Sequence, residues 1–450
     1  MGRQLIKAQA IVTMDAQRRV LEGGGILVGD GVIEQVLSRE EAAGLRDFAG
    51  EVVNVEGLTA VPGFVQTHIH LCQTLFRGLA DDLDLLDWLR LRIFPYEAAH
   101  SPSSMRASSL LGLAELIRSG TTTIMDMGSV HFEEEIVRAI DETGLRAYVG
   151  KSMIDLNEIY PPLREQTRDA IDSSARQAER WHGRSGGRIR YAVAPRFVLS
   201  CTDDLLKEAY SLTASFPGML FHTHAAESSR EMEAVRARCG KDNIEHFESL
   251  GVLHPNTCLA HCIWVNRAEV DLLRTRQAKV LHCPSSNLKL GSGVARIPEF
   301  LRYGITVSLG ADGAPCNNTL DAFQEMRLAA LVQKPPHGPA AMGARTVLEM
   351  ATLGGAATLG LSEAIGSIER GKRADITLLD LNRVWNPCHG SGYDELCSTI
   401  VYSCTPENVH SVVIDGEWLY RDGHHVRLDE RVVYERAGAE LGDLLNRLRY

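Results

Sequence analysis

The stretch VPGFVQTHIH, residues 61–70, runs through apolar residues and ends on two histidines, His68 and His70. A short apolar run of this kind is typical of a buried strand. Because side chains alternate along a strand, His68 and His70 face the same side and can reach one ion. The stretch therefore predicts a strand over 61–67 that delivers two imidazoles to a site at its carboxyl end.

Outward from this stretch, strand-like and helix-like segments alternate along the chain. The predicted strands are 61–67, 121–126, 147–154, 189–195, 219–224, 257–261, 278–282 and 305–311. One intervening helix is well marked, with Ser101 as N-cap, Pro102 in its first turn and Gly120 at its end. Eight strands that alternate with helices indicate an α/β fold of the (β/α)₈ (TIM) barrel type rather than an open doubly wound sheet.

The two ends of the chain share a different texture, that of short strands joined by turns. Asp30-Gly31 separates two apolar runs near the start, and Asp415-Gly416 and Asp422-Gly423 do so near the end. Such dipeptides mark tight hairpin turns. We therefore predict a small β-sandwich domain built from residues 1–60 and 366–450, the latter with a terminal helix, around a barrel over 61–365.

Composition narrows the class of protein. The 450 residues have a formal net charge of −11 and lack a cluster of Lys and Arg, which argues against a nucleic-acid partner. The start is too polar for a secretory signal, and no apolar run is long enough to span a membrane. Ten cysteines occur without a CxxC pair, so we expect reduced thiols in a cytoplasmic protein.

Four more chemically active residues stand at the ends of predicted strands, namely His224, His261, His282 and Asp312. A single histidine there is more often a hydrogen-bonded structural residue than a ligand, and an aspartate before glycine is usually part of a turn. Barrel enzymes, however, place their chemistry at the carboxyl ends of the strands. The coincidence over five strand ends favours a site of imidazoles and one carboxylate that suits Zn²⁺ or Fe²⁺.

Two choices remain open around the fifth strand. His222 shares a strand face with His224 and could replace it as a ligand, but Glu227, three residues after His224, favours His224. Glu227 could be a favourable acid in the first turn of a helix. Beside a metal-activated water, it would instead deliver protons, as the glutamate of zinc deaminases does.

Several motifs taken together resemble those of the amidohydrolase superfamily, in its nucleobase and nucleoside deaminase branch. They are PGFVQTHIH, HTHAAE, LAHC, HCPSSNLKLGSGVA, LGADGAPCNN and ATLGGAATLGL, in this order along nearly the whole chain. The HxH pair alone would be moderate evidence, whereas the ordered set is specific.

The resemblance implies a role for each of these residues. One divalent metal, Zn or Fe, would be held by His68, His70, His224 and Asp312. Asp312 would also take the proton from the attacking water, Glu227 would shuttle protons, and His261 would hold and polarise the water. His282 would line the pocket.

Two subfamily patterns overlap. TLFRGLADDLDLLDWL, SNLKLGSG and DGAPCNNTLDAFQEMRLAALVQK are similar to methylthioadenosine/S-adenosylhomocysteine deaminases, a group that includes 5′-deoxyadenosine deaminases. There, Glu97 would bind ribose hydroxyls and Lys151 would stand in for an arginine that binds the substrate carboxylate. Arg196 departs from this group, which has histidine at that place.

The Pro-Arg-Phe of residues 195–197 and Gln73 instead look like guanine deaminase, where both side chains could bind a purine edge. Structural roles stay open as well, since Arg196 could pair with an acid, Gln73 could bond backbone, and Lys151 could be structural.

We therefore expect hydrolytic deamination of an aminopurine, most of all a 5′-modified adenosine, by a homo-oligomer, either a dimer or a tetramer. The substrate would be a small heteroaromatic amine. Guanine deamination and displacement of an amino or chloro group from an s-triazine are the alternatives within the enzyme class. A non-catalytic assembly protein is the remote one, because such proteins lose ligands and this chain has the full set.

Overall fold

A computed structural model describes residues 2–45, 48–158, 160–386 and 390–449. The chain forms two compact units. The barrel unit comprises Thr67–Leu113, Ile124–Leu320 and Asp429–Tyr450, and the end-sheet unit comprises Met1–Gln66, Ala114–Thr123 and Asp321–Leu428. The domain boundaries predicted from the sequence stay a prediction.

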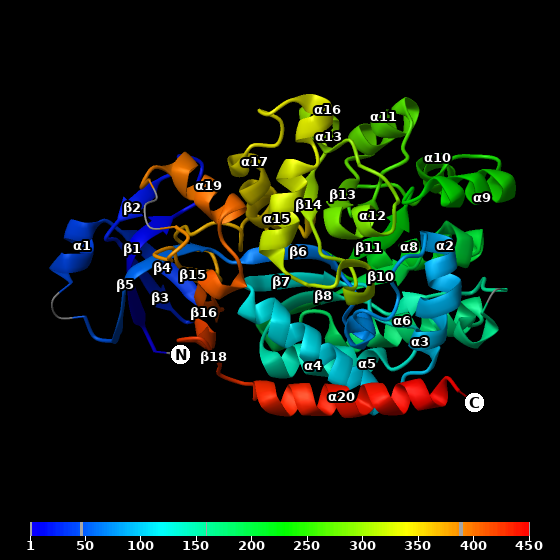
Figure 1. Ribbon diagram of the computed structural model, residues 1–450, viewed down its shortest axis with the longest axis horizontal. Helices are drawn as coiled ribbons and strands as arrows, with labels where there is room; N and C mark the ends of the chain where they lie inside the picture. The colour runs from blue at the N-terminus through cyan, green and yellow to red at the C-terminus, as the bar shows by residue number, and fades with distance from the viewer. Residues whose placement is uncertain (1, 46–47, 159, 387–389, 450) are drawn as a thin grey trace. The chain divides into compact units, whose positions relative to one another are not determined.

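Eight parallel strands close into a barrel (Figure 1). The strands are β6 (Phe64–Ile69), β7 (Thr121–Asp126), β8 (Arg146–Val149), β10 (Ile189–Pro195), β11 (Leu220–Ala225), β12 (Thr257–His261), β13 (Lys279–His282) and β14 (Val307–Leu309). Each pairs with the next in this order, and β14 pairs with β6. The predicted (β/α)₈ fold is confirmed.

Helices follow most of the barrel strands. They are α4 (Pro102–Arg118), α5 (Glu133–Thr143), α6 (Thr167–Trp181), α8 (Asp203–Leu212), α9 (Ser229–Cys239), α10 (Asn243–Leu250), α11 (Arg267–Arg276), α12 (Pro284–Lys289) and α13 (Ile297–Arg302). The last helix of the chain is α20 (Glu430–Arg447). Helix α9 starts with a capping box, in which Ser228 and Glu231 satisfy each other's backbone N–H groups.

The predicted strand limits are wrong in detail at glycines. Residues 61–62 end strand β5 (Glu51–Pro62), and the first barrel strand begins after Gly63, where a Cβ atom would lie 2.1 Å from Thr122. The segment 147–154 splits into β8 and β9 (Ser152–Met153), with Gly150 at the break, where a Cβ atom would lie 1.7 Å from the Ala192 carbonyl oxygen. Glycine is therefore required at both breaks.

The two chain ends build one mixed sheet, mostly antiparallel, in the order β18-β17-β16-β15-β5-β1-β3-β4, with β2 beside β1. Its strands besides β5 are β1 (Gln4–Val12), β2 (Val20–Glu22), β3 (Gly25–Gly29), β4 (Val32–Leu37), β15 (Ile376–Asp380), β16 (Val409–Ile414), β17 (Glu417–Arg421) and β18 (His424–His425). Asp30 and Gly31 both have positive φ between the antiparallel β3 and β4, as the hairpin signal predicts.

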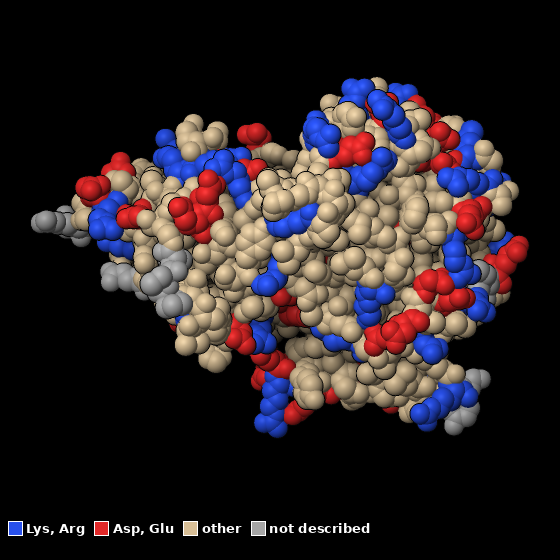
Figure 2. Space-filling view, turned by 45° about the horizontal axis from the view of Figure 1, so that its top comes forward, with Lys and Arg blue, Asp and Glu red and all other residues tan. Residues whose placement is uncertain are grey.

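The distribution of charged side chains and the state of the cysteines agree with what the composition predicts. Basic and acidic side chains are interspersed on the face drawn in Figure 2. Within the described ranges, no helix has the length and apolar character that a membrane crossing needs. The nine described cysteines are free thiols, and most are buried; Cys388 lies outside the described residues.

Candidate metal centre and active site

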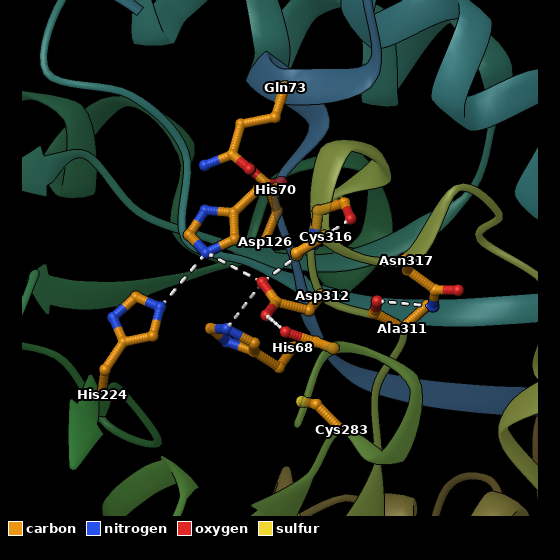
Figure 3. Close-up of polar contacts among 12 residues, drawn as sticks. His68, His70, Gln73, Asp126, His224, Cys283, Ala311, Asp312, Cys316 and Asn317 are labelled. Carbon is orange, nitrogen blue, oxygen red and sulfur yellow. Dashed lines mark hydrogen bonds and ion pairs between the residues drawn. The ribbon is translucent and has the colours of Figure 1, made fainter. Parts of the chain in front are cut away.

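Four side chains converge at the carboxyl ends of three barrel strands. His68 and His70 come from β6, His224 comes from β11, and Asp312 follows β14, with one ligand atom of each within 4.8 Å of the others (Figure 3). His70 Nε2 lies 3.3 Å from His224 Nε2, and His68 Nε2 lies 3.4 Å from Asp312 Oδ1. Two nitrogens bound tetrahedrally to one Zn²⁺ lie roughly 3.3 Å apart. The residues therefore fit a divalent metal ion.

The backbone explains how Asp312 reaches the histidines. A Cβ on Gly310 would lie 2.7 Å from the His68 carbonyl oxygen, so only glycine lets the end of β14 approach β6 this closely. The Asp312 N–H then donates to His68 O at 3.0 Å. Asp312 has φ +62°, and its Oδ1 accepts the Gly313 N–H at 2.8 Å. The aspartate is therefore part of a turn and also a member of the cluster.

Hydrogen bonds to the outer nitrogens orient two of the imidazoles, those of His68 and His224. His224 Nδ1 donates to Arg196 O at 2.7 Å, which leaves the Nε2 lone pair for a metal. His68 Nδ1 lies 2.8 Å from His222 Nε2, and His68 Nε2 has no hydrogen-bond partner among the residues that the structure describes. His222 thus contacts the outer nitrogen of His68 and is not a member of the four-residue cluster. The member from strand β11 is His224.

The protonation states of the four clustered side chains suit the binding of a cation. Burial lowers the pKa values of His68, His70 and His224, so these imidazoles are neutral. Burial acts to raise the pKa of Asp312, but the imidazoles around it, His68 first, hold that pKa well below its usual value. Neutral nitrogens and an ionised carboxylate are the forms that bind metal.

The two histidines of strand β11 give a metal-content prediction. We expect His224→Ala to lose at least nine-tenths of its bound divalent metal, because it removes a ligand atom. His222→Ala should keep the metal but bind it about 10- to 100-fold more weakly, since it removes only the partner that orients His68. Elemental analysis after dialysis against a graded chelator measures both. Equal loss in the two variants would contradict the ligand assignment.

Glu227 and His261 lie beside the metal cluster. Glu227 Oε2 is 3.5 Å from His261 Nε2, and Asp312 Oδ2 is 3.9 Å from the same nitrogen. Burial first, and then the charge of Asp312, raise the pKa of Glu227 well above its usual value. A bound divalent cation would instead lower the pKa of Glu227. Glu227 is thus a buried carboxyl group that can hold a proton next to the metal position.

Local structure fixes Glu227 and His261. The Glu227 N–H donates to Glu231 Oε2 at 2.7 Å, at the start of helix α9. His261 Nδ1 donates to Asn287 Oδ1 at 2.8 Å, and both residues are buried. An amide oxygen only accepts, so Nδ1 of His261 carries a proton and Nε2 is the nitrogen that faces Glu227.

The sequence reasoning missed Asn287 and its neighbour Ser286. Ser286 Oγ donates to Asp312 Oδ2 at 2.7 Å and so holds the carboxylate from the side of helix α12. Both residues lie in the motif HCPSSNLKLGSGVA, directly after a strand that ends on His282. Polar residues at a barrel strand end were therefore the available signal.

A cavity of about 20 Å³ adjoins the cluster. The described residues that line it are His70, Gln73, Leu85, Trp88, Leu89, Arg196, Phe197, His224, Glu227 and Asp312. Of the predicted substrate-binding residues, Gln73 and Arg196 are in this set. Glu97, Lys151 and His282 are not in it.

Glu97, Gln73 and Arg196 form a buried network. Arg196 Nη1 and Nη2 donate to Glu97 Oε2 and Oε1 at 2.6 and 3.0 Å, and Gln73 Nε2 donates to Glu97 Oε1 at 2.8 Å. Lys151 Nζ is paired with Glu165 and bonded to the Ser152 carbonyl. That substrate touches Glu97, Lys151 or His282 stays a prediction.

A closed (β/α)₈ barrel with three histidines and one aspartate at its strand ends defines a class of metal-dependent barrel enzymes. Residues 59–419 match the amidohydrolase family, and the chain belongs to this family. The resemblance drawn from the motifs is thereby confirmed.

Similar proteins cover almost the whole chain. A 5′-deoxyadenosine deaminase of Methanothermobacter thermautotrophicus is 39% identical over 427 residues, 94% of this chain and 97% of its own length. A 5-methylthioadenosine/S-adenosylhomocysteine deaminase of Desulforamulus reducens is 34% identical over 97% of this chain and 98% of its own. The structure of an adenosine deaminase from Xanthomonas campestris with bound zinc has a TM-score of 0.91, 30% identity and 98% coverage of both chains.

Proposed function

We propose that the protein catalyses the hydrolytic deamination of an adenine nucleoside modified at its 5′ position, releasing the inosine analogue and ammonia. The observation that carries the proposal is the buried Glu227 beside the His/Asp cluster, 3.5 Å from His261. The names of the relatives point to the same reaction and to the substrate class.

The proposed metal is one Zn²⁺, held by His68, His70, His224 and Asp312. Imidazole and carboxylate ligands suit zinc, and a solved relative has zinc bound. When bound, the ion would activate water as a nucleophile at neutral pH.

The chain's own residues would then move the protons. Asp312 accepts one proton from the attacking water, and Glu227 donates its proton to ring nitrogen N1 as the C6–O bond forms. Glu227, now a carboxylate, takes the proton of the new C6 hydroxyl and passes it to the amino group. The C6–N bond breaks, ammonia leaves, and the proton held by Asp312 returns to Glu227. His261, fixed by Asn287, accepts a hydrogen bond at Nε2 and orients the water. One water is consumed for each ammonia released.

An ammonia-release panel tests the proposal with the zinc-loaded protein. It contains 5′-deoxyadenosine, methylthioadenosine, S-adenosylhomocysteine, adenosine, guanine and an s-triazine. We expect the highest kcat/KM among the 5′-modified adenosines, and at least tenfold less for guanine. Turnover of guanine or the triazine with the adenosines untouched would overturn the proposed substrate class but not the metal chemistry.

A further inference from the structure

A short segment over the metal cluster forms one wall of the cavity. We call residues 81–98 the lid segment; it contains α2 (Leu85–Trp88), a π-helical turn η2 (Leu89–Ile93) and α3 (Phe94–Ala98). Leu85, Trp88 and Leu89 line the cavity, whereas Leu91 on the same turn is 40% exposed. π-Helical turns occur often at functional sites.

The cavity is too small for the proposed substrate. Its volume of about 20 Å³ has room for a single water molecule. Pockets for small-molecule ligands measure roughly 300–1,000 Å³. A wall must therefore move when a nucleoside binds, and the walls other than the lid segment include the metal cluster and Arg196.

Exposed ion pairs tie the first part of the lid segment to helices α9 and α12. Arg230, at the start of α9, contacts Asp84 at 2.5 Å and Asp87 at 3.3 Å, and Lys289 contacts Asp81 at 2.5 Å. Surface pairs of this kind contribute little to stability. These ion pairs therefore oppose movement of residues 81–89 only weakly, whereas Glu97 at the other end of the lid segment stays joined to Arg196 by a buried ion pair.

Apart from the metal-cluster residue His70, two described side chains that line this cavity have a buried polar atom without a partner. Trp88 is 4% exposed, and its indole Nε1 has no hydrogen bond to any described residue; the same holds for Gln73 Oε1. Buried donors and acceptors are nearly always satisfied, and each exception needs an explanation. A ligand in the enlarged cavity would supply an acceptor to Trp88 and a donor to Gln73.

The chemistry of the reaction decides which part of the substrate faces Trp88. The amino-bearing carbon must lie at Glu227 and the His/Asp cluster. The sugar is attached to the opposite side of the purine, so it extends away from the cluster. On that side of the substrate the acceptors for an N–H group are the ribose oxygens and purine nitrogen N3.

We propose that Trp88 is a specificity-determining residue whose Nε1–H donates a hydrogen bond to a ribose oxygen of the bound nucleoside. This inference rests on the proposed function and extends it, because it gives the lid segment a part in recognising the sugar. The indole ring also continues the apolar wall formed by Leu85 and Leu89.

The test compares Trp88→Phe with the wild-type protein, both full length and zinc-loaded. The substrates are adenosine and its 2′-deoxy, 3′-deoxy and 5′-deoxy analogues. Phenylalanine keeps an aromatic wall but lacks the N–H donor. We expect kcat/KM on adenosine to fall about 10- to 30-fold, mainly through KM. For one deoxy analogue, the one that lacks the contacted oxygen, the two proteins should differ less than threefold.

Leu91→Ala is the matched control, since Leu91 lies on the same helical turn but is exposed. It should leave all four values of kcat/KM unchanged. An equal loss by Trp88→Phe on every analogue, or no loss, would overturn the inference, because Trp88 would then contact the purine or serve only as a wall. If wild-type protein deaminates no adenine nucleoside, the proposed function fails, and the ribose contact fails with it.

A second measurement does not depend on how the variant folds. The chain has five tryptophans, so ¹⁵N-labelled wild-type protein gives five indole signals. On addition of inosine, we expect the Trp88 signal to move downfield, with a much smaller shift for the deoxyinosine that lacks the contacted oxygen. No indole signal that distinguishes these products would overturn the inference.

Discussion

Replacing Glu227 with glutamine is expected to lower kcat on the best adenosine substrate by about 10³- to 10⁴-fold, with the metal retained. Glutamine has nearly the shape of glutamic acid but neither gives nor takes a proton at neutral pH. Glu227 is 4% exposed, and burial raises its pKa well above the usual value, so a neutral amide should fit there without loss of stability. Single-turnover ammonia release and elemental analysis measure the two quantities.

Glu269→Gln is the matched control for Glu227. Glu269 is also fully buried, and burial raises its pKa to about 7. Its carboxylate accepts the backbone N–H groups of Ile244, at the start of helix α10, and of Asn266, the N-cap of helix α11, and Glu269 does not line the cavity. We expect that variant to keep kcat within about threefold. Full activity of a metal-loaded Glu227→Gln protein would remove Glu227 from the mechanism.

The barrel and the ligand set were predictable because their signals are local. Apolar runs of strand length end on histidines, and the alternation of side chains in a strand places His68 and His70 on one side. His222 and His224 share a strand face by the same rule, so the sequence leaves the choice between them open. Tertiary contacts make the distinction, because His224 bonds Arg196 O and His222 meets the ring of His68.

The surroundings of the ligands were not predictable in the same way. Arg196 and Glu97 are far apart in the chain, and only the closed barrel brings them to 2.6 Å. Trp88 lies in the run DLDLLDWLRLRI, where a tryptophan reads as one more core residue. That its indole N–H has no hydrogen-bond partner among the described residues can be recognised only from the three-dimensional positions of the surrounding side chains.

The alternation of side chains that holds along an extended strand does not apply at the end of strand β12. In an extended strand the side chains of His261 and Cys262 would point to opposite sides, but these residues have φ of +73° and +48°. Cys262 lies outside the metal cluster for another reason, since its thiol is directed to the Leu259 carbonyl. Strained backbone of this kind is common at functional sites and carries no simple sequence signal.

Arg196→Met is expected to lower the free energy of unfolding by about 3–5 kcal/mol. Arg196 and Glu97 are each 3% exposed and joined by two hydrogen bonds, so methionine leaves the Glu97 carboxylate buried without its counter-charge. The metal should stay, because the backbone carbonyl of residue 196 still accepts from His224 Nδ1. Urea unfolding of the metal-loaded protein, followed by circular dichroism, measures the change.

The double variant Arg196→Met/Glu97→Gln separates the lost charge pair from lost packing. Glutamine at 97 is neutral, and its amide oxygen can still accept from Gln73 Nε2, which now donates to Glu97 at 2.8 Å. If the unpaired carboxylate causes the loss, the double variant should recover more than half of it, because removing both charges of a buried pair costs far less than removing one. A double variant as unstable as Arg196→Met would instead assign the loss to the contact of the guanidinium with the Phe94 ring, whose centroid lies 5.3 Å away.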